Sequence, residues 1–199
     1  QTVGMGKDLV EQSPAAAAVF READATLGWS VSELCFTGPA DKLTMSRFCQ
    51  PAIYTMSVAC LAAFREAQPD ATPVGVAGLS LGEFAALHAA GVFSFADGLR
   101  LVARRGELMD QCCQNHPGTM ASVLGAELPV VQEVCAACDI DVANYNCPGQ
   151  VVISGPREGV TAAIEQLKAR GVRKLVPLNV AGAYHSRLMR PAGEAFAAV

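Results

Sequence analysis

The stretch VGVAGLSLGE, residues 74–83, decides the fold because it places a G-x-S-x-G motif between an apolar strand pattern and a helical pattern. We expect a strand over residues 74–77 and a helix after Ser80, where apolar residues recur at helical spacing as far as Gly91. A serine on the sharp turn between a strand and a helix exposes its hydroxyl, so this context predicts a nucleophilic Ser80. The N–H of Leu81 would then face the oxyanion formed on attack, and the two glycines of the motif would keep the turn uncrowded.

The elements around this turn follow an α/β order. An apolar stripe over residues 50–68, with Pro51 at its start, predicts an amphipathic helix packed on a sheet. Downstream, Ser94 is a candidate N-cap for a long helix that begins at Phe95 and ends before Asn115. The order of helix, strand, serine turn and helix predicts an α/β, hydrolase-like body with a parallel sheet.

Shorter units follow Gly118. The predicted elements are a strand over 119–124, a helix over 128–137, strands over 140–144 and 150–154, a helix over 159–170 and a strand over 173–179. The order βαββαβ is that of a ferredoxin-like lobe. We therefore expect a body formed by residues 1–117 and 186–199, with a ferredoxin-like subdomain of residues 118–185 inserted into it.

Composition narrows the class of protein. The chain has 199 residues, of which 51% are hydrophobic, so it can bury a core, and its net charge of −4 argues against nucleic-acid binding. No apolar run approaches the roughly 18 residues needed to span a bilayer, and the first residues are too polar for a signal peptide, so we expect a cytoplasmic protein. The eight cysteines include one C-x-x-C pair, residues 135 and 138, with no second pair, which predicts reduced, mostly buried thiols and no metal site.

A serine hydroxyl needs a neighbouring base to become a nucleophile at neutral pH, and the chain offers three histidines. His88 falls within the predicted serine helix, where a structural role is expected. His116 lies in an Asn-His-Pro-Gly turn and is expected to be exposed. His185 lies where the second lobe returns the chain to the body, and it is therefore the best candidate for the base.

Six motifs occur in order along nearly the whole chain. They are QTVGMG at residues 1–6, QPA at 50–52, GLSLGE at 78–83, RGELM at 105–109, NYNCPGQVVISG at 144–155 and AYHSRLM at 183–189. In residue type and spacing they resemble those of the malonyl-CoA:acyl-carrier-protein transacylases of fatty-acid synthesis and of the related acyltransferase domains of polyketide synthases. Leu79 departs from the family pattern, which usually has histidine before the serine.

The resemblance implies a role for each matching residue. Ser80 would be acylated, His185 would be its base and Leu81 would supply an oxyanion contact. Arg105 would hold the free malonyl carboxylate, for which a guanidinium fork is suited, although its sequence context alone favours a solvated helix arginine. The other expected substrate-binding residues are Gln50, Asn146 and Tyr184, the last of which should disfavour α-methyl malonyl groups.

The implied reaction moves malonyl from malonyl-CoA, through an acyl-serine, to the phosphopantetheine thiol of an acyl carrier protein, without a metal or other cofactor of its own. The chain begins inside the first motif and stops at Val199, so we expect it to be part of a longer enzyme and weakly active alone. Two alternatives remain open. One is a serine esterase or patatin-like acyl hydrolase, and the other is an inactive acyltransferase-like module that binds a carrier protein.

Overall fold

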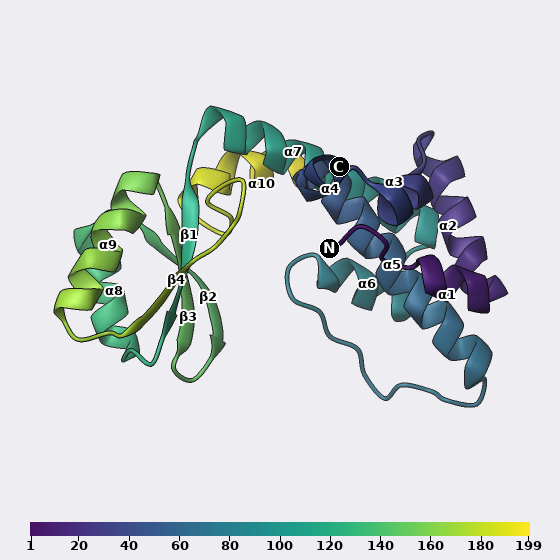
Figure 1. The fold of residues 1–199 in the computed structure, drawn as a ribbon, viewed down its shortest axis with the longest axis horizontal. Coiled ribbons are helices and arrows are strands. Elements are labelled where there is room, and N and C mark those ends of the chain that lie inside the picture. The colour runs from purple at the N-terminus through teal and green to yellow at the C-terminus, as the bar shows by residue number, and fades with distance from the viewer. The chain divides into compact units, whose positions relative to one another are not determined.

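The computed structural model describes residues 1–199, which form two compact units, Gln1–Leu108 and Met109–Val199 (Figure 1). Helix α7 (Phe95–Asn115) begins in the first unit and ends in the second. Each unit has its own set of elements.

The first unit is helical. Its elements are α1 (Lys7–Gln12), α2 (Pro14–Leu27), α3 (Val31–Thr37), α4 (Ala40–Thr44), α5 (Ser46–Ala67), α6 (Gly82–Ala89) and the first part of α7. Serine side chains cap three of them, because Ser13 Oγ accepts from the N–H of Ala16 at 3.1 Å, Ser30 Oγ from that of Glu33 at 3.0 Å and the predicted cap Ser94 from that of Asp97 at 3.1 Å. These caps satisfy N–H groups that have no partner within their own helix.

Helix α5 lies at the centre of the core of the first unit. Its Tyr54 and Val58 are buried together with Phe20 of α2, Leu34 of α3 and Leu99 of α7. The predicted helix over residues 50–68 is confirmed, but it begins at Ser46, a turn before Pro51. Proline removes one N–H donor from the helix ladder, and α5 continues through that position.

The expected strand over residues 74–77 is wrong. Residues 71–78 form no helix or strand, and Figure 1 shows a long irregular connection between α5 and α6. A strand takes its backbone hydrogen bonds from a neighbouring strand, and none pairs with this segment in residues 1–199. The apolar side chains of Val74 and Val76 are accordingly exposed, and the expected parallel sheet is not seen in this chain.

The second unit contains one four-stranded sheet with the order β2-β3-β1-β4, and every neighbouring pair is antiparallel. Its elements after α7 are β1 (Thr119–Leu124), α8 (Leu128–Ala137), β2 (Asp141–Cys147), β3 (Gln150–Gly155), α9 (Arg157–Ala169), β4 (Lys174–Pro177), the 3-10 helix η1 (Arg187–Met189) and α10 (Arg190–Phe196). The predicted βαββαβ order is confirmed. Strand β2 runs three residues further than expected, and β4 is shorter than expected.

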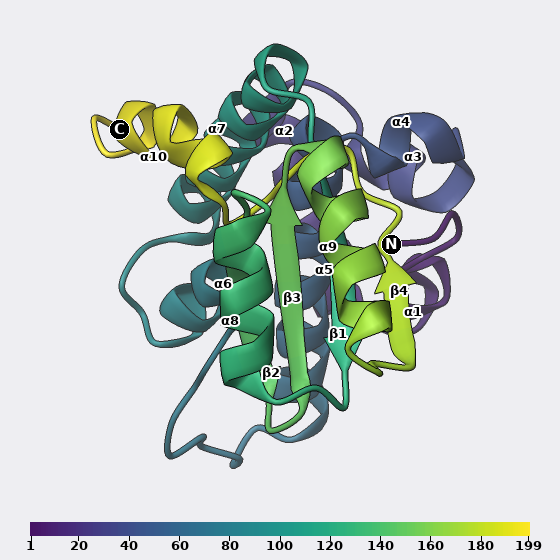
Figure 2. The same cartoon turned by 90° about the vertical axis from the view of Figure 1, so that its left-hand side faces the viewer.

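Helices α8 and α9 cover one face of this sheet, as Figures 1 and 2 show. Ala121, Val123 and Ile153 of the central strands pack there against buried residues of the two helices, which include Val131 and Leu167. Alternation along β1 and β3 sends every second side chain to this face. The lobe therefore has an apolar core of its own.

All eight cysteines are free thiols, and four of them are buried. Burial raises the pKa of Cys35 to about 12 and the pKa of Cys135 to about 11, so both are protonated at neutral pH. Cys60 and Cys147 are exposed, so fewer thiols are buried than expected. None of the helices combines the length and the apolar character needed to cross a bilayer.

Candidate active site

Ser80 lies on a sharp turn directly before helix α6. Its φ angle is 53°, a left-handed conformation that is uncommon for a residue other than glycine. The N–H of Gly82 donates to the carbonyl of Leu79 at 2.8 Å, and the N–H of Glu83 donates to that of Ser80 at 3.3 Å. The turn and helix expected around the serine are therefore present, although the strand before them is not.

The first glycine of the motif is required by the geometry of this turn. A Cβ atom on Gly78 would lie 2.1 Å from the carbonyl carbon and oxygen of Gly82, which are backbone atoms and cannot rotate away. A Cβ on Gly82 would meet no atom within 4 Å. The expectation that both glycines prevent crowding is therefore correct for Gly78 and wrong for Gly82.

Gly78→Ala should disrupt the serine turn, because residues 78–80 must move to relieve the backbone clash. We expect at least about a tenfold slower acylation of Ser80, since small displacements of a nucleophile have large kinetic effects. Rapid-quench mass spectrometry of the Ser80 peptide measures this rate. Gly193→Ala is the matched control, because a Cβ there meets nothing within 4 Å. Equal rates for the two variants would contradict the prediction.

Arg105 of α7 lies beside Ser80. Its Nη2 donates to Ser80 Oγ at 2.8 Å, and its Nη1 donates to Oε1 of the buried Gln50 at 2.5 Å. The guanidinium carbon also lies 5.9 Å from the centre of the Phe84 ring. The first unit thus brings together three of the residues that the sequence singled out, from α5, the serine turn and α7.

Close packing of two helices makes this arrangement possible. A Cβ on Gly106 would lie 2.6 Å from the carbonyl oxygen of Ser46, so α7 can approach the start of α5 only because this residue is glycine. The approach places Arg105 next to Gln50, one turn further along α5. Arg104 instead pairs with Glu107 at 3.2 Å on an exposed face of the helix. The two neighbouring arginines therefore have different environments.

The electrostatics of this site favour an anion. A guanidinium presents several N–H donors in a fixed fork, and here two of its nitrogens donate to a hydroxyl and to an amide oxygen. A ligand carboxylate beside Ser80 could accept from the same fork and gain a charge-assisted pair. Arg105 is half-buried, which weakens solvent screening of such a pair.

His88 has a packed environment, as expected of a structural histidine. Its ring lies 6.5 Å from the centre of the Tyr54 ring and 6.2 Å from that of Phe95, and its Nδ1 lies 3.2 Å from the carbonyl oxygen of Phe93. All of these groups belong to the first unit.

The remaining candidate residues belong to the second unit. His185 is exposed and has a left-handed φ of 56°. Tyr184 is half-buried and hydrogen-bonds the thiol of Cys113, whose pKa is raised mainly by burial. Asn146 is exposed near the end of β2. Since Ser80 lies in the first unit, its pairing with His185 stays a prediction.

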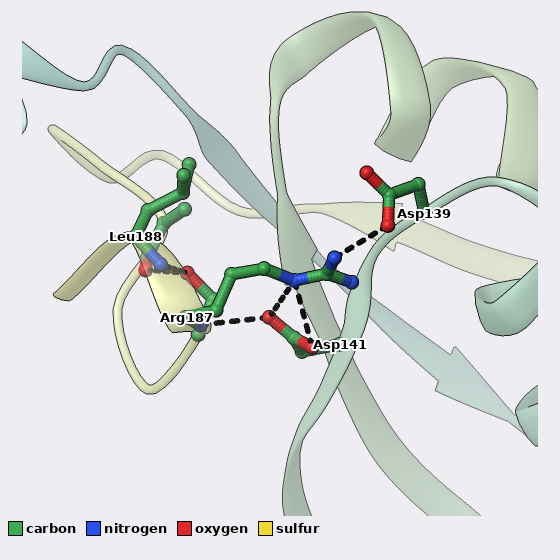
Figure 3. Close-up of polar contacts among 6 residues, drawn as sticks. Asp139, Asp141, Arg187 and Leu188 are labelled. Carbon is green, nitrogen blue, oxygen red and sulfur yellow. Dashed lines mark hydrogen bonds and ion pairs between the residues drawn. The ribbon is translucent and has the colours of Figure 1, made fainter. Parts of the chain in front are cut away.

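Sequence reasoning missed two features of these sites. It placed Phe84 on a helical stripe but assigned it no contact with Arg105. It also did not anticipate the ion pairs that Arg187 forms with two aspartates near His185 (Figure 3). The motifs do not indicate either contact, because each contact depends on how distant segments pack.

Comparison with known proteins agrees with the motifs. The family model described as "Acyl transferase domain" matches residues 1–199. A malonyl CoA-acyl carrier protein transacylase of Bacillus subtilis (strain 168) is 44% identical over 199 residues, covering 98% of this chain and 62% of that protein.

Solved structures give the same result. The crystal structure of MCAT from Streptococcus pneumoniae matches with a TM-score of 0.91 at 38% identity, over 100% of this chain and 65% of that one. A malonyl-transacylase solved in complex with a type II PKS acyl-carrier protein matches with a TM-score of 0.94 at 35% identity, also over 100% and 65%. The chain thus spans less than two thirds of the length of these relatives. It has their helix-rich α/β fold over its whole length, and it belongs to the acyl transferase domain family.

Proposed function

We propose that this chain carries the active site of a malonyl-CoA:acyl-carrier-protein S-malonyltransferase of fatty-acid synthesis. The observation that carries the proposal is the hydrogen bond of 2.8 Å from Arg105 to the hydroxyl of Ser80. A malonyl group esterified to Ser80 has its free carboxylate one methylene carbon from the ester, so a guanidinium at this distance is within its reach. The names of the relatives and the six motifs support the same activity.

The proposed reaction has two halves. Ser80 Oγ attacks the thioester carbon of malonyl-CoA while its proton passes to His185, and backbone N–H groups that include Leu81 stabilise the oxyanion. The C–S bond then breaks, and the CoA thiolate takes the proton from His185. In the second half, the phosphopantetheine thiol of the carrier gives its proton to His185 and attacks the ester, and Ser80 regains a proton as it leaves.

The other candidate residues complete the proposed site. Gln50 would orient Arg105, and its hydrogen bond of 2.5 Å to that side chain supports this role. Asn146 would line the pocket, and Tyr184 would exclude α-methyl groups by its bulk. The enzyme would use no metal or other cofactor of its own, and its partners would be malonyl-CoA and an acyl carrier protein.

We also propose the finer organisation of the fold. The first unit would belong to a hydrolase-like body with a parallel sheet, and elements of that body would cover the exposed Val74 and Val76. The body would comprise residues 1–117 and 186–199, and residues 118–185 would form the ferredoxin-like subdomain. A cytoplasmic location is proposed with this activity, and the free thiols support it.

One experiment separates this function from the two alternatives. The full natural chain is incubated with malonyl-CoA, the Ser80 peptide is examined by mass spectrometry, and a phosphopantetheine-bearing carrier protein is then added. We expect a malonyl adduct on Ser80 that the carrier discharges faster than water does. Discharge to water at the same rate with or without carrier would indicate an acyl hydrolase, and the absence of any adduct would indicate an inactive binding module.

A further inference from the structure

The loop that carries His185, residues 183–189, is tied to the start of strand β2 by Arg187 (Figure 3). The backbone N–H of Arg187 donates to Asp141 Oδ2 at 2.8 Å, and its Nε lies 3.3 Å from each carboxylate oxygen of Asp141. Arg187 Nη1 also donates to Asp139, which lies in the turn before β2. We call the contacts of Arg187 with Asp139 and Asp141 the loop latch.

The sheet holds one side of the loop latch in place. Asp141 is the first residue of β2, and it pairs with Ser154 of the adjacent strand β3. Ile140, which lies between the two aspartates, is buried in the core of the lobe. Both carboxylates therefore extend from a backbone whose position is determined by the packed lobe.

The His185 loop itself has a conformation that requires support. The φ of 56° at His185 is sparsely occupied by residues with a side chain and persists where the surroundings hold it. Within the loop, Ser186 Oγ donates to the carbonyl of Ala183 at 2.6 Å and accepts from the N–H of Leu188 at 3.2 Å. These bonds link the two sides of His185 to each other but do not attach the loop to the lobe.

The ends of the loop pack against α7. Cys112 Sγ donates to the carbonyl of Leu188 at 2.9 Å, and a Cβ on Gly182 would lie 2.2 Å from Cys113 Sγ. The loop latch adds an attachment between these two ends, at Arg187, which is two residues after His185. The hydrogen bond from the backbone N–H of Arg187 to Asp141 is directional. It therefore constrains the peptide between Ser186 and Arg187, close to His185, as well as the Arg187 side chain.

We propose that Asp141 is a positioning residue that holds His185 in its active geometry through the backbone N–H of Arg187, with Asp139 steadying the arginine. This inference rests on the proposed function, in which His185 is the base. Arg187 is 44% exposed and Asp139 86% exposed, and exposed ion pairs contribute little to stability. The expected effect is therefore on the chemical step and not on folding.

The kinetic test compares two variants of Asp141 in the full natural chain. Asp141→Ala removes the acceptor, and we expect kcat for malonyl transfer to fall by about ten- to a hundredfold with KM for malonyl-CoA within about twofold. Asp141→Asn keeps an oxygen that can accept from the N–H of Arg187, and it should recover most of that loss. Glu133→Gln is the matched control. It breaks an exposed ion pair of the same lobe, in which Glu133 and Arg170 lie 2.8 Å apart and neither belongs to the His185 loop.

Hydrogen exchange provides a readout that does not depend on activity. We expect faster exchange of the amides of residues 183–189 in Asp141→Ala, and exchange like that of the unmodified protein in Glu133→Gln. Exchange that is unchanged in Asp141→Ala would overturn the inference. Faster exchange with an unchanged kcat, or an equal loss in Asp141→Asn, would also overturn it.

The failure of the proposed function is recognised separately. If Ser80→Ala takes up malonyl as the unmodified protein does, the proposed function is wrong, whatever the Asp141 variants do. If Ser80 is acylated and His185→Ala slows that acylation, while Asp141→Ala matches Glu133→Gln, only the positioning role is wrong.

Discussion

Ser80→Ala should abolish malonyl transfer and leave no malonyl adduct on the protein. The proposed reaction passes through an ester on the Ser80 hydroxyl, and no other group at the turn can replace that oxygen. In enzymes with an activated serine, removal of the nucleophile costs at least about 10⁴-fold in kcat. Intact-protein mass spectrometry after incubation with malonyl-CoA, together with a steady-state transfer assay, measures both effects.

The matched control for this variant is Ser57→Ala. Ser57 is an exposed serine on α5 whose hydroxyl donates to the carbonyl of Ile53 at 2.9 Å, so it loses a hydroxyl of the same kind. We expect full labelling of this variant. A malonyl adduct on Ser80→Ala, equal in amount to that on Ser57→Ala, would show that another residue is the nucleophile.

Arg105→Ala should lose malonyl transfer selectively. Each charge-assisted hydrogen bond to a carboxylate contributes about 1.5 to 3 kcal/mol, so the loss of two predicts a fall of about 10² to 10⁴-fold in kcat/KM for malonyl-CoA. Acetyl-CoA has no carboxylate that could pair with the guanidinium, so its transfer should be retained or improved. The measurement is the ratio of kcat/KM for the two thioesters.

Two further variants test the reason for this selectivity. Arg104→Ala removes the neighbouring arginine, which pairs with Glu107 on the exposed face, and it should keep the malonyl preference of the unmodified protein. Arg105→Lys keeps the charge but loses the fork, so its preference should be intermediate. If Arg105→Ala slows malonyl and acetyl transfer equally, the residue supports Ser80 and does not select the substrate.

Local patterns in the sequence were sufficient to predict helices α5 to α9 and the antiparallel lobe. Helix α8 and strand β1 have the predicted bounds, and β3 begins at the predicted residue. These elements could be predicted because a helix makes its hydrogen bonds within one segment, and because the lobe contains all the strands that its sheet requires. Residues 74–77 have the same apolar character, but no strand of residues 1–199 pairs with them, and they form no strand.

The candidate site, like the fold, was predicted in part from the sequence and was decided in part by packing. The motifs identified Ser80, Gln50 and Arg105 but could not indicate that the arginine donates to both of the others, because that contact joins residues 25 and 55 positions apart. The environment of Arg105 was decided by the approach of α7 to α5 at Gly106. A helical pattern alone did not distinguish this side chain from Arg104.

By itself, the sequence determined which residue types are available for chemistry, the positions of helices α5 to α9 and the βαββαβ order of the lobe. These depend on side-chain type and on interactions between residues that are near neighbours in the chain. Three features were decided by the tertiary structure alone. They are the position of the Arg105 guanidinium beside the Ser80 hydroxyl, the steric need for glycine at residue 78 and the attachment of the His185 loop to Asp141. Each of these is a contact between atoms that only packing brings within a few ångströms, so no local pattern encodes it.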